Sequence, residues 1–314
     1  MKPRGQELGI LVILIVLCAI TAIKNPAFLH LENLQNTGQL FGIYGIFSIG
    51  IGIVIITGGI DLSVGSVLAL LGVILAILLV DKHVNPLLSV FIVVAGAALL
   101  GWGHGLLVAR MRMQPFIVTL CGLLFYRGLA RFISNDETKG FGDAKGFEWL
   151  QKASTESWHG VPIPVIILLA VAVVMYIVLH KTVYGRYLFA VGRNEEAARY
   201  AGINSKAVIA SAYVLCGALA GIATILLAFY TNSISPSSHG SFYELYGIAA
   251  AVLGGCSLRG GEGSIAGILL GAALLQVLRN LVNLLHIPSS LEFSVMGVVI
   301  LIGVLADTLL RKKR

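Results

Sequence analysis

Residues 42–80 read GIYGIFSIGIGIVIITGGIDLSVGSVLALLGVILAILLV, and Asp61 is the only charged side chain among them. A membrane-spanning helix needs about 20 consecutive apolar residues. The stretch supplies two such runs, separated by a short polar and glycine-containing segment around Asp61. Because the runs are continuous and do not alternate every second residue, they predict helices and not the strands of a membrane β-barrel.

The rest of the sequence has the same character. Of the 314 residues, 57% are hydrophobic and 12% are charged, whereas charged residues make up about 25% of an ordinary soluble domain. A soluble protein of this length needs a charged surface that this sequence does not supply. This excludes a soluble enzyme, a DNA-binding protein and a disordered protein. We therefore predict an all-α polytopic membrane protein, with one transmembrane domain over residues 1–314.

About ten spans are predicted, at residues 8–23, 39–57, 62–80, 87–109, 115–133, 163–180, 207–230, 243–258, 264–285 and 291–310. The first resembles a signal peptide but lacks a convincing small-residue cleavage site, so we expect it to be retained as a helix. The eighth is short and glycine-rich, and it either crosses the membrane or re-enters it from one side.

Basic residues are concentrated near the N-terminus, after the fourth predicted span, in the loop 181–206 and at the C-terminus. Cytoplasmic loops of membrane proteins carry an excess of such residues. Ten crossings place all of these segments, and therefore both termini, in the cytoplasm, and they place segment 134–162 outside. The basic balance thus predicts orientation in a lipid bilayer, and no nucleic-acid motif accompanies it.

The first candidate functional segment follows the second predicted span and contains Gly58, Gly59, Asp61, Ser63, Gly65 and Ser66. A charge inside a membrane costs about 3 kcal/mol on insertion scales, so Asp61 needs a specific role. Either Asp61 or Ser63 caps the N-terminus of the third span, or Asp61 is part of a gate. A similar glycine-rich segment at 254–261 precedes the ninth span, and paired breaks of this kind point to a transport pathway.

A short helix is predicted within the basic loop 181–206. An N-capping asparagine, early acids, a late arginine and a terminal glycine all agree with the helix dipole. A short exposed helix gains little stability alone, so we expect a partner surface. The candidate residues are Asn194, Glu195, Glu196, Ala197, Ala198, Arg199 and Gly202. Glu195, Ala198 and Arg199 are expected to face that partner.

Polar residues within two other spans form smaller patterns. Gln276, Asn280 and Asn283 are spaced four and three residues apart and share one helix face. They either hydrogen-bond to neighbouring helices or line a conduit for a hydroxylated solute. Arg127 and Arg131, at the outer end of the fifth span, are expected to extend toward the lipid headgroups.

Several chemical motifs are absent from the sequence. It has no G-x-x-x-x-G-K-[ST] nucleotide loop, no HExxH motif and no His/Cys cluster. Few acidic residues lie within the predicted spans, which argues against a self-contained ion-coupled carrier. We expect no catalytic residue, no metal and no cofactor in this chain.

Four segments together resemble the permease subunits of ribose-type ABC sugar importers. They are TGGIDLSVGSVLAL (57–70), QPFIVTLCGLLFYRGLA (114–130), GRYLFAVGRNEEAARYAGI (185–203) and LGGCSLRGGEGSIAGILLGAALLQVLRNLVNLL (253–285). The resemblance covers nearly the whole chain. Cys121, Gly122, Tyr126 and Glu262 depart from the pattern, which bears on the identity of the solute.

The resemblance implies a multi-pass protein of the inner membrane that is a transporter subunit and not an enzyme. Its implied partners are cytoplasmic ABC ATPase subunits, an extracytoplasmic sugar-binding protein and a second permease copy, giving a homodimer. The helix at 194–201 would then be the coupling helix that docks on the ATPase.

The sequence thus predicts a permease that moves a monosaccharide such as ribose by alternating access. The alternatives are a self-contained channel or secondary carrier, and an ABC permease for a non-sugar solute.

Overall fold

The computed structural model describes residues 4–142, 146–288, 291, 294–295, 297–298 and 301. Within these residues, eight helices are long and apolar enough to cross a membrane. They are α1 (Arg4–Lys24), α2 (Leu31–Ile56), α3 (Val64–Ala76) extended by the π-helical turn η2 (Ile77–Asp81), α4 (Pro86–Ala109), α5 (Pro115–Ile133), α7 (Ile163–Lys181), α10 (Ser205–Tyr230) and α12 (Ile265–Leu284). The predicted all-α polytopic fold is confirmed. Most of the predicted span 291–310 and the terminal basic cluster lie outside the described residues.

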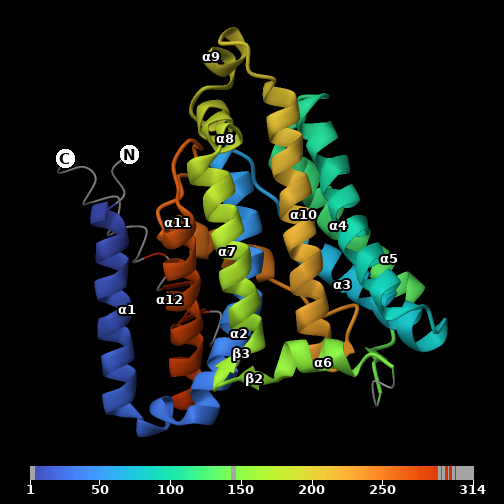
Figure 1. Cartoon of the computed structure of the whole chain (residues 1–314), viewed down its shortest axis with the longest axis vertical. Coiled ribbons are helices and arrows are strands. Elements are labelled where there is room, and N and C mark those ends of the chain that lie inside the picture. The colour runs from blue at the N-terminus through green and yellow to red at the C-terminus, as the bar shows by residue number, and fades with distance from the viewer. Residues whose placement is uncertain are drawn as a thin grey trace.

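Shorter elements gather at the two ends of the helix bundle (Figure 1). The helices at one end, between α7 and α10, are α8 (Val183–Arg193) and α9 (Glu195–Tyr200). The elements at the opposite end are α6 (Glu148–Thr155) and the antiparallel strand pair β2 (Ser157–Trp158) and β3 (Val161–Pro162). The remaining short elements are η1 (Pro26–Leu29) and the antiparallel pair β1 (Lys139–Gly140) and β4 (Ser233–Ile234).

Local sequence explains where several helices begin. Asn85 accepts a hydrogen bond from the Leu87 amide at 2.9 Å before α4, and Asn204 accepts one from the Ala207 amide at 3.2 Å before α10. Pro86 and Pro115 occupy the first turns of α4 and α5, where a missing N–H costs nothing. These caps satisfy amides that lipid cannot satisfy.

Helices α2 and α10 form the centre of the bundle. In the most apolar stretches of α2 and α10, 83% and 78% of the residues are buried, whereas the corresponding share in α1 is 11%. Helix α4 packs closely along α10, because Gly101 lies against the Tyr213 carbonyl and Gly217 lies against the Ala97 carbonyl. A side chain at either glycine would collide with the opposing backbone, so small residues set the separation of these helices.

Two helices, α3 and α11 (Tyr243–Leu253), begin next to each other inside the bundle. Gly65, in the first turn of α3, lies against the Gly240 carbonyl and the Glu244 carboxylate at the start of α11. After α11, the Gly261 amide donates to the Ile56 carbonyl at the end of α2 at 2.8 Å. The 11 residues of α11 extend about 16 Å, roughly half of a bilayer core of about 30 Å. Residues 231–242 connect α11 to the far end of α10 at Tyr230, and Gly261 after α11 reaches the end of α2 beside α8, so the structure favours the crossing alternative for 243–258, with α11 as the helical half of that crossing.

Candidate functional site

The short helix expected in the loop 181–206 is present as α9. Asn194 Oδ1 accepts a hydrogen bond from the Ala197 amide at 2.9 Å, as its sequence position predicts. Glu195 Oε1 accepts a hydrogen bond from the Ser205 hydroxyl at 3.0 Å, which ties α9 to the first turn of α10. Gly202 follows with φ of 83°, a conformation that closes a helix and favours glycine.

The two faces of α9 differ in polarity. Ala198 is 5% exposed and packs into the hydrophobic core, which corrects the expectation that Ala198 faces a partner. Glu196, Arg199 and Tyr200 are exposed, and the Arg199 guanidinium lies 5.8 Å from the Tyr200 ring centroid. Tyr200 was not predicted from the sequence as a contact residue, although an 83% exposed tyrosine is suited to an interface.

Helix α8 was also not predicted from the sequence, and its last turn contacts two other backbone segments. At Gly192, a β-carbon would collide with the Ile56 carbonyl and the Gly261 amide. Gly260 in turn lies against the Gly192 carbonyl and the Gly58 backbone. The two glycine-rich segments identified in the sequence therefore meet beside the residue that leads into α9. We refer to residues 56–58, 192 and 260–261 as the glycine junction.

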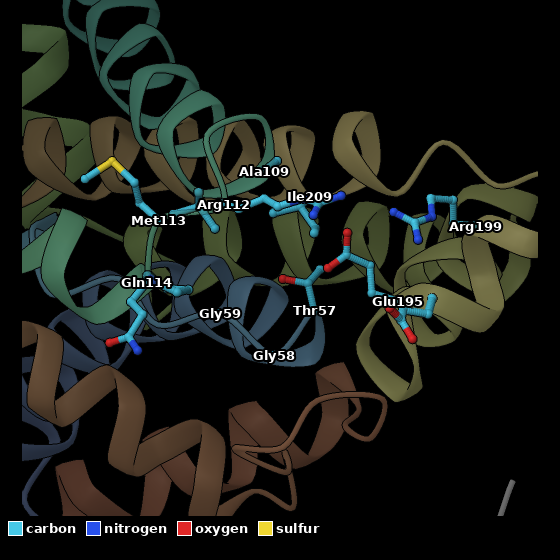
Figure 2. Close-up of a pocket in the computed structure, with 13 residues that line it drawn as sticks. Thr57, Gly58, Gly59, Ala109, Arg112, Met113, Gln114, Glu195, Arg199 and Ile209 are labelled. Atoms are coloured by element: carbon cyan, nitrogen blue, oxygen red, sulfur yellow. The ribbon is translucent and has the colours of Figure 1, made fainter.

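A cavity of about 430 Å³ connects the end of α2 to α9 (Figure 2). Its wall includes residues 57–59, the charged residues of α9, the connection 112–115 between α4 and α5, and apolar side chains of α4 and α10. These are Thr57, Gly58, Gly59, Val108, Ala109, Arg112, Met113, Gln114, Pro115, Glu195, Glu196, Arg199 and Ile209. Figure 2 shows Glu195 and Arg199 at one end of the cavity and Met113 and Gln114 at the other. The structure thus brings together the glycines of one candidate set, Gly58 and Gly59, and the charged residues of the other.

Asp61 and Ser63 are not among the residues that line this cavity, and both are buried, with 2% and 1% exposure. Asp61 Oδ1 accepts hydrogen bonds from the Ser63 amide at 2.9 Å and the Ser63 hydroxyl at 2.6 Å. Ser63 Oγ lies 3.3 Å from His104 Nδ1, and His104 Nε2 lies 3.1 Å from the Tyr126 hydroxyl. We call these four residues the Asp61–Tyr126 network.

The direction of the network follows from its proton count. Ser63 has one hydroxyl proton, which it donates to Asp61, so its oxygen accepts from His104 Nδ1–H. In a neutral imidazole, Nε2 then accepts from the Tyr126 hydroxyl. The network joins α3, α4 and α5, with every donor directed toward Asp61. The Ser63 side chain makes no capping hydrogen bond to α3, and both hydrogen bonds that Asp61 accepts come from Ser63, so Asp61 holds the turn before the helix and does not cap its first-turn amides.

The remaining turn residues position α3. The Ile60 carbonyl, just before Asp61, accepts a hydrogen bond from the Tyr213 hydroxyl at 3.2 Å, and it lies 3.3 Å from the Thr119 hydroxyl, which also donates to the Pro115 carbonyl at 2.8 Å. Gly65 allows the start of α11 to approach, as described above, and Ser66 is 1% exposed within α3. The turn is therefore held by hydroxyl groups from α5 and α10.

The structure separates the three members of the polar stripe on α12. Asn280 and Asn33 of α2 exchange two amide hydrogen bonds, at 2.7 and 3.1 Å. Gln276 is 5% exposed and lines a small cavity with Tyr44 and Arg279. Asn283 is exposed. Inter-helix bonding therefore describes Asn280, and the three residues do not line one common cavity.

The two arginines of α5 also differ from the expectation that both extend toward headgroups. Arg127 Nη1 donates to the Pro236 carbonyl at 2.9 Å and the His239 carbonyl at 2.7 Å, so it anchors the loop that precedes α11. Arg131 forms a two-pronged pair with exposed Asp136, at 2.6 and 2.9 Å. The expectation is corrected for Arg127, because its guanidinium binds two carbonyls of the loop between α10 and α11 and does not extend toward lipid.

Comparison with known proteins identifies the family. The chain matches the family model described as branched-chain amino acid transport system / permease component over residues 33–304. The chain belongs to this permease family. Within the family, it is 39% identical over 309 residues to the ribose import permease protein RbsC of Bacillus subtilis, covering 98% of this chain and 94% of the relative.

Other relatives show similar coverage. Identity is 40% over 312 residues to RbsC of Escherichia coli, covering 98% of this chain and 95% of the relative. It is 33% over 316 residues to the L-arabinose transport system permease protein AraH of Escherichia coli, covering 98% and 92%. No solved structure matches the chain. The predicted membership of a ribose-type permease family is confirmed.

Proposed function

We propose that this chain is the permease subunit of an ABC importer that carries a monosaccharide such as ribose inward across the cytoplasmic membrane by alternating access. The observation that carries this proposal is identity of 39–40% to ribose import permeases over 98% of the chain. The arabinose relative supports a five-carbon sugar. The chain itself is a transporter subunit and not an enzyme, and ATP hydrolysis belongs to a separate subunit.

The distribution of charge supports an orientation with α9 in the cytoplasm. The basic loop 181–206 and the connection holding Arg110 and Arg112 both lie at the end of the bundle that carries α9. Helix α6 lies at the other end (Figure 1). Since cytoplasmic loops carry the basic excess, α9 faces the cytoplasm and α6 faces outward. We therefore propose ten crossings with both termini in the cytoplasm.

The outer face of α9 is the proposed contact with the ATPase. Glu196, Arg199 and Tyr200 supply charge and an aromatic surface, Asn194 caps the helix, and Glu195 fixes it to α10. A displacement of α9 would reach α2 and the 254–261 segment through the glycine junction, because backbone there contacts backbone without intervening side chains. Gly58 and Gly59 would then act as the turn that moves with α9, and Asp61, Ser63, Gly65 and Ser66 as the point where α3 is held.

The proposed assembly contains two permease copies, an ATPase pair and an extracytoplasmic sugar-binding protein. The test is reconstitution of this assembly in liposomes, with ribose-stimulated ATP hydrolysis and uptake of labelled ribose as readouts. We expect both activities to require the binding protein. Uptake of ribose by the permease alone, without ATPase or binding protein, would instead identify a self-contained carrier.

A second solute class follows from the description of the family model, which names branched-chain amino acids. The same liposomes distinguish the two classes when labelled leucine replaces labelled ribose. We expect ribose uptake and no leucine uptake. Leucine uptake without ribose uptake would leave the assignment as an ABC permease intact, but the solute would then be an amino acid and not a sugar.

A further inference from the structure

A groove of about 780 Å³ lies between α4 and α5. Its volume is within the range of about 300–1,000 Å³ that is typical of small-molecule sites. The rim carries exposed apolar side chains, Met111 at 68% and Phe125 at 64% exposure. His104 and Tyr126 line it as well, although they are only 3% and 9% exposed. The groove therefore combines apolar and aromatic walls with a polar floor.

Two glycines shape the groove. At Gly103, on α4, a β-carbon would meet nothing within 4 Å, so this position adds open space. At Gly122, on α5, a β-carbon would lie 2.6 Å from His104 Nε2, so a larger residue would disturb the His104–Tyr126 contact. Gly122 and Tyr126 are among the residues that depart from the family pattern in the sequence, and both lie in this groove.

One oxygen on the floor of the groove can accept a further hydrogen bond. The Tyr126 hydroxyl proton is directed to His104, but its oxygen retains lone pairs that can accept another hydrogen bond. An acceptor beside aromatic and aliphatic surface suits a solute that carries both hydroxyl groups and C–H faces. Arg110 lies at the end of the groove toward the 110–114 connection, where a cation requires contact with water.

The floor of the groove is also connected to the cavity beside α9. His104 contacts Ser63, Ser63 contacts Asp61, and Asp61 closely follows the turn at Gly58 and Gly59 that lines the cavity beside α9. A hydrogen bond made or lost at Tyr126 therefore acts, through Asp61, close to the turn that lines the same cavity as Glu195 and Arg199. The network thus links the proposed solute contact at Tyr126 to a residue two positions after the turn that lines the same cavity as α9.

We propose that the α4–α5 groove is the solute-contacting wall of the transport pathway, where the Tyr126 oxygen accepts a hydrogen bond from a hydroxyl of the passing monosaccharide. This inference rests on the proposed function as a sugar importer. It assigns the groove to an aqueous pathway, in contrast to a lipid-facing surface or a contact with the second permease copy.

Cys121 provides a direct probe, because it is exposed and lines the groove. The reconstituted wild-type assembly is treated with a charged methanethiosulfonate reagent, and modified cysteines are identified by peptide mass spectrometry. We expect Cys121 to react, ribose to slow the reaction, and modification to block uptake. Cys18, on peripheral α1, should react only with a lipid-soluble maleimide.

The other outcomes of the labelling overturn the proposal. If Cys121 reacts with the lipid-soluble reagent and not with the charged one, the groove faces lipid. If Cys121 reacts with neither reagent, the second permease copy or another part of the assembly covers it. If ribose leaves the rate of charged labelling unchanged, the groove is wet but is not the solute pathway.

A conservative substitution tests the hydrogen bond itself. Tyr126→Phe removes the hydroxyl, and we expect uptake at low ribose concentration to fall about three- to tenfold, the usual weight of one hydrogen bond. Uptake of a deoxy analogue that lacks the matching hydroxyl should change little. Tyr184→Phe is the matched control, because Tyr184 binds Ser211 at 2.7 Å and does not line the groove.

The two proposals fail in distinguishable ways. If the wild-type assembly carries no sugar, the proposed function fails, whatever the labelling of Cys121 shows. If the wild type carries ribose but Tyr126→Phe behaves as Tyr184→Phe does, with the same loss for ribose and its deoxy analogues, the groove assignment alone fails.

Discussion

The Asp61–Tyr126 network and the outer face of α9 are both polar, yet they use polarity in opposite ways. In the network, each of the four residues is at most 9% exposed and each contacts another member. On α9, Glu196, Arg199 and Tyr200 face away from the bundle. Buried polar groups must be satisfied within the chain, so the network holds helices together. Exposed groups are free to exchange water for a partner, so α9 is suited to docking.

The largest predicted effect comes from breaking the network at its acceptor. Asp61→Leu leaves the buried Ser63 amide and hydroxyl without their partner, and each lost partner costs about 1–3 kcal/mol. We expect little folded protein, measured by size-exclusion yield and by thermal unfolding in detergent. Asp61→Asn retains an acceptor oxygen and should fold and transport nearly as the wild type does. Normal folding with abolished transport in Asp61→Asn would assign Asp61 to gating.

Arg127 and Arg131 extend the same comparison within one helix, since they lie four residues apart on α5. Arg127→Met leaves the Pro236 and His239 carbonyls without their charged donor, and hydrogen bonds to charged groups contribute about 1.5–3 kcal/mol each. We expect a clear drop in melting temperature together with reduced transport. Equal melting temperatures for Arg127→Met and the wild type would show that the loop before α11 does not depend on this contact.

Arg131→Met is the matched control for Arg127→Met. Arg131 binds the exposed Asp136, and its hydrogen bond lowers the pKa of Asp136. Exposed ion pairs contribute little to stability, so the melting temperature should stay near that of the wild type. A drop as large as that of Arg127→Met would remove the distinction between the two arginines.

The features predicted correctly from the sequence depend on composition and local signals. Continuous apolar runs identified the fold class, and the residues at Asn194 and Gly202 were sufficient to locate α9. Ala198 was wrongly predicted to face a partner, because a helix as short as α9 has too few residues for the sequence to show which of its faces is apolar. Its inner face is decided by contact with the hydrophobic core, which is a tertiary property.

Long-range pairing explains the features that the sequence did not reveal. His104 is a single histidine in an apolar span, and nothing local indicates that Ser63 and Tyr126 lie on either side of it. The carbonyl partners of Arg127 belong to a loop between two other helices. Gly58 and Gly260 belong to segments that resemble each other in sequence, but their contact depends on the chain returning after α11 to the end of α2. The two glycine-rich segments therefore marked this region of the sequence as a candidate site, but they did not indicate which of their residues are in contact.

On the docking side, the next effect in size concerns Tyr200. Tyr200→Ala removes an exposed aromatic ring, and interface tyrosines of this kind contribute about 2 kcal/mol or more. We expect about a 30-fold weaker affinity for the ATPase, measured by titration of labelled ATPase onto the permease in nanodiscs, with an unchanged melting temperature of the permease. Ala198→Asp, on the buried face of α9, should weaken ATPase binding and should also lower the melting temperature of the permease. Unchanged ATPase affinity in Tyr200→Ala would show that this face is not the docking surface.

The smallest predicted effect comes from the cap of α9. Asn194→Ala removes the acceptor for the Ala197 amide, and loss of an N-cap costs about 1 kcal/mol of helix stability. Because α9 has only six residues, this loss should fray the helix and leave the membrane spans intact. We expect the melting temperature to stay constant while ATPase affinity falls about fivefold, since part of the binding energy is then used to re-form the helix. Asn194→Ser, which restores an N-cap acceptor, should recover most of the affinity. If Asn194→Ala and Asn194→Ser weaken binding equally, the asparagine contacts the ATPase directly, and the effect is not one of helix stability.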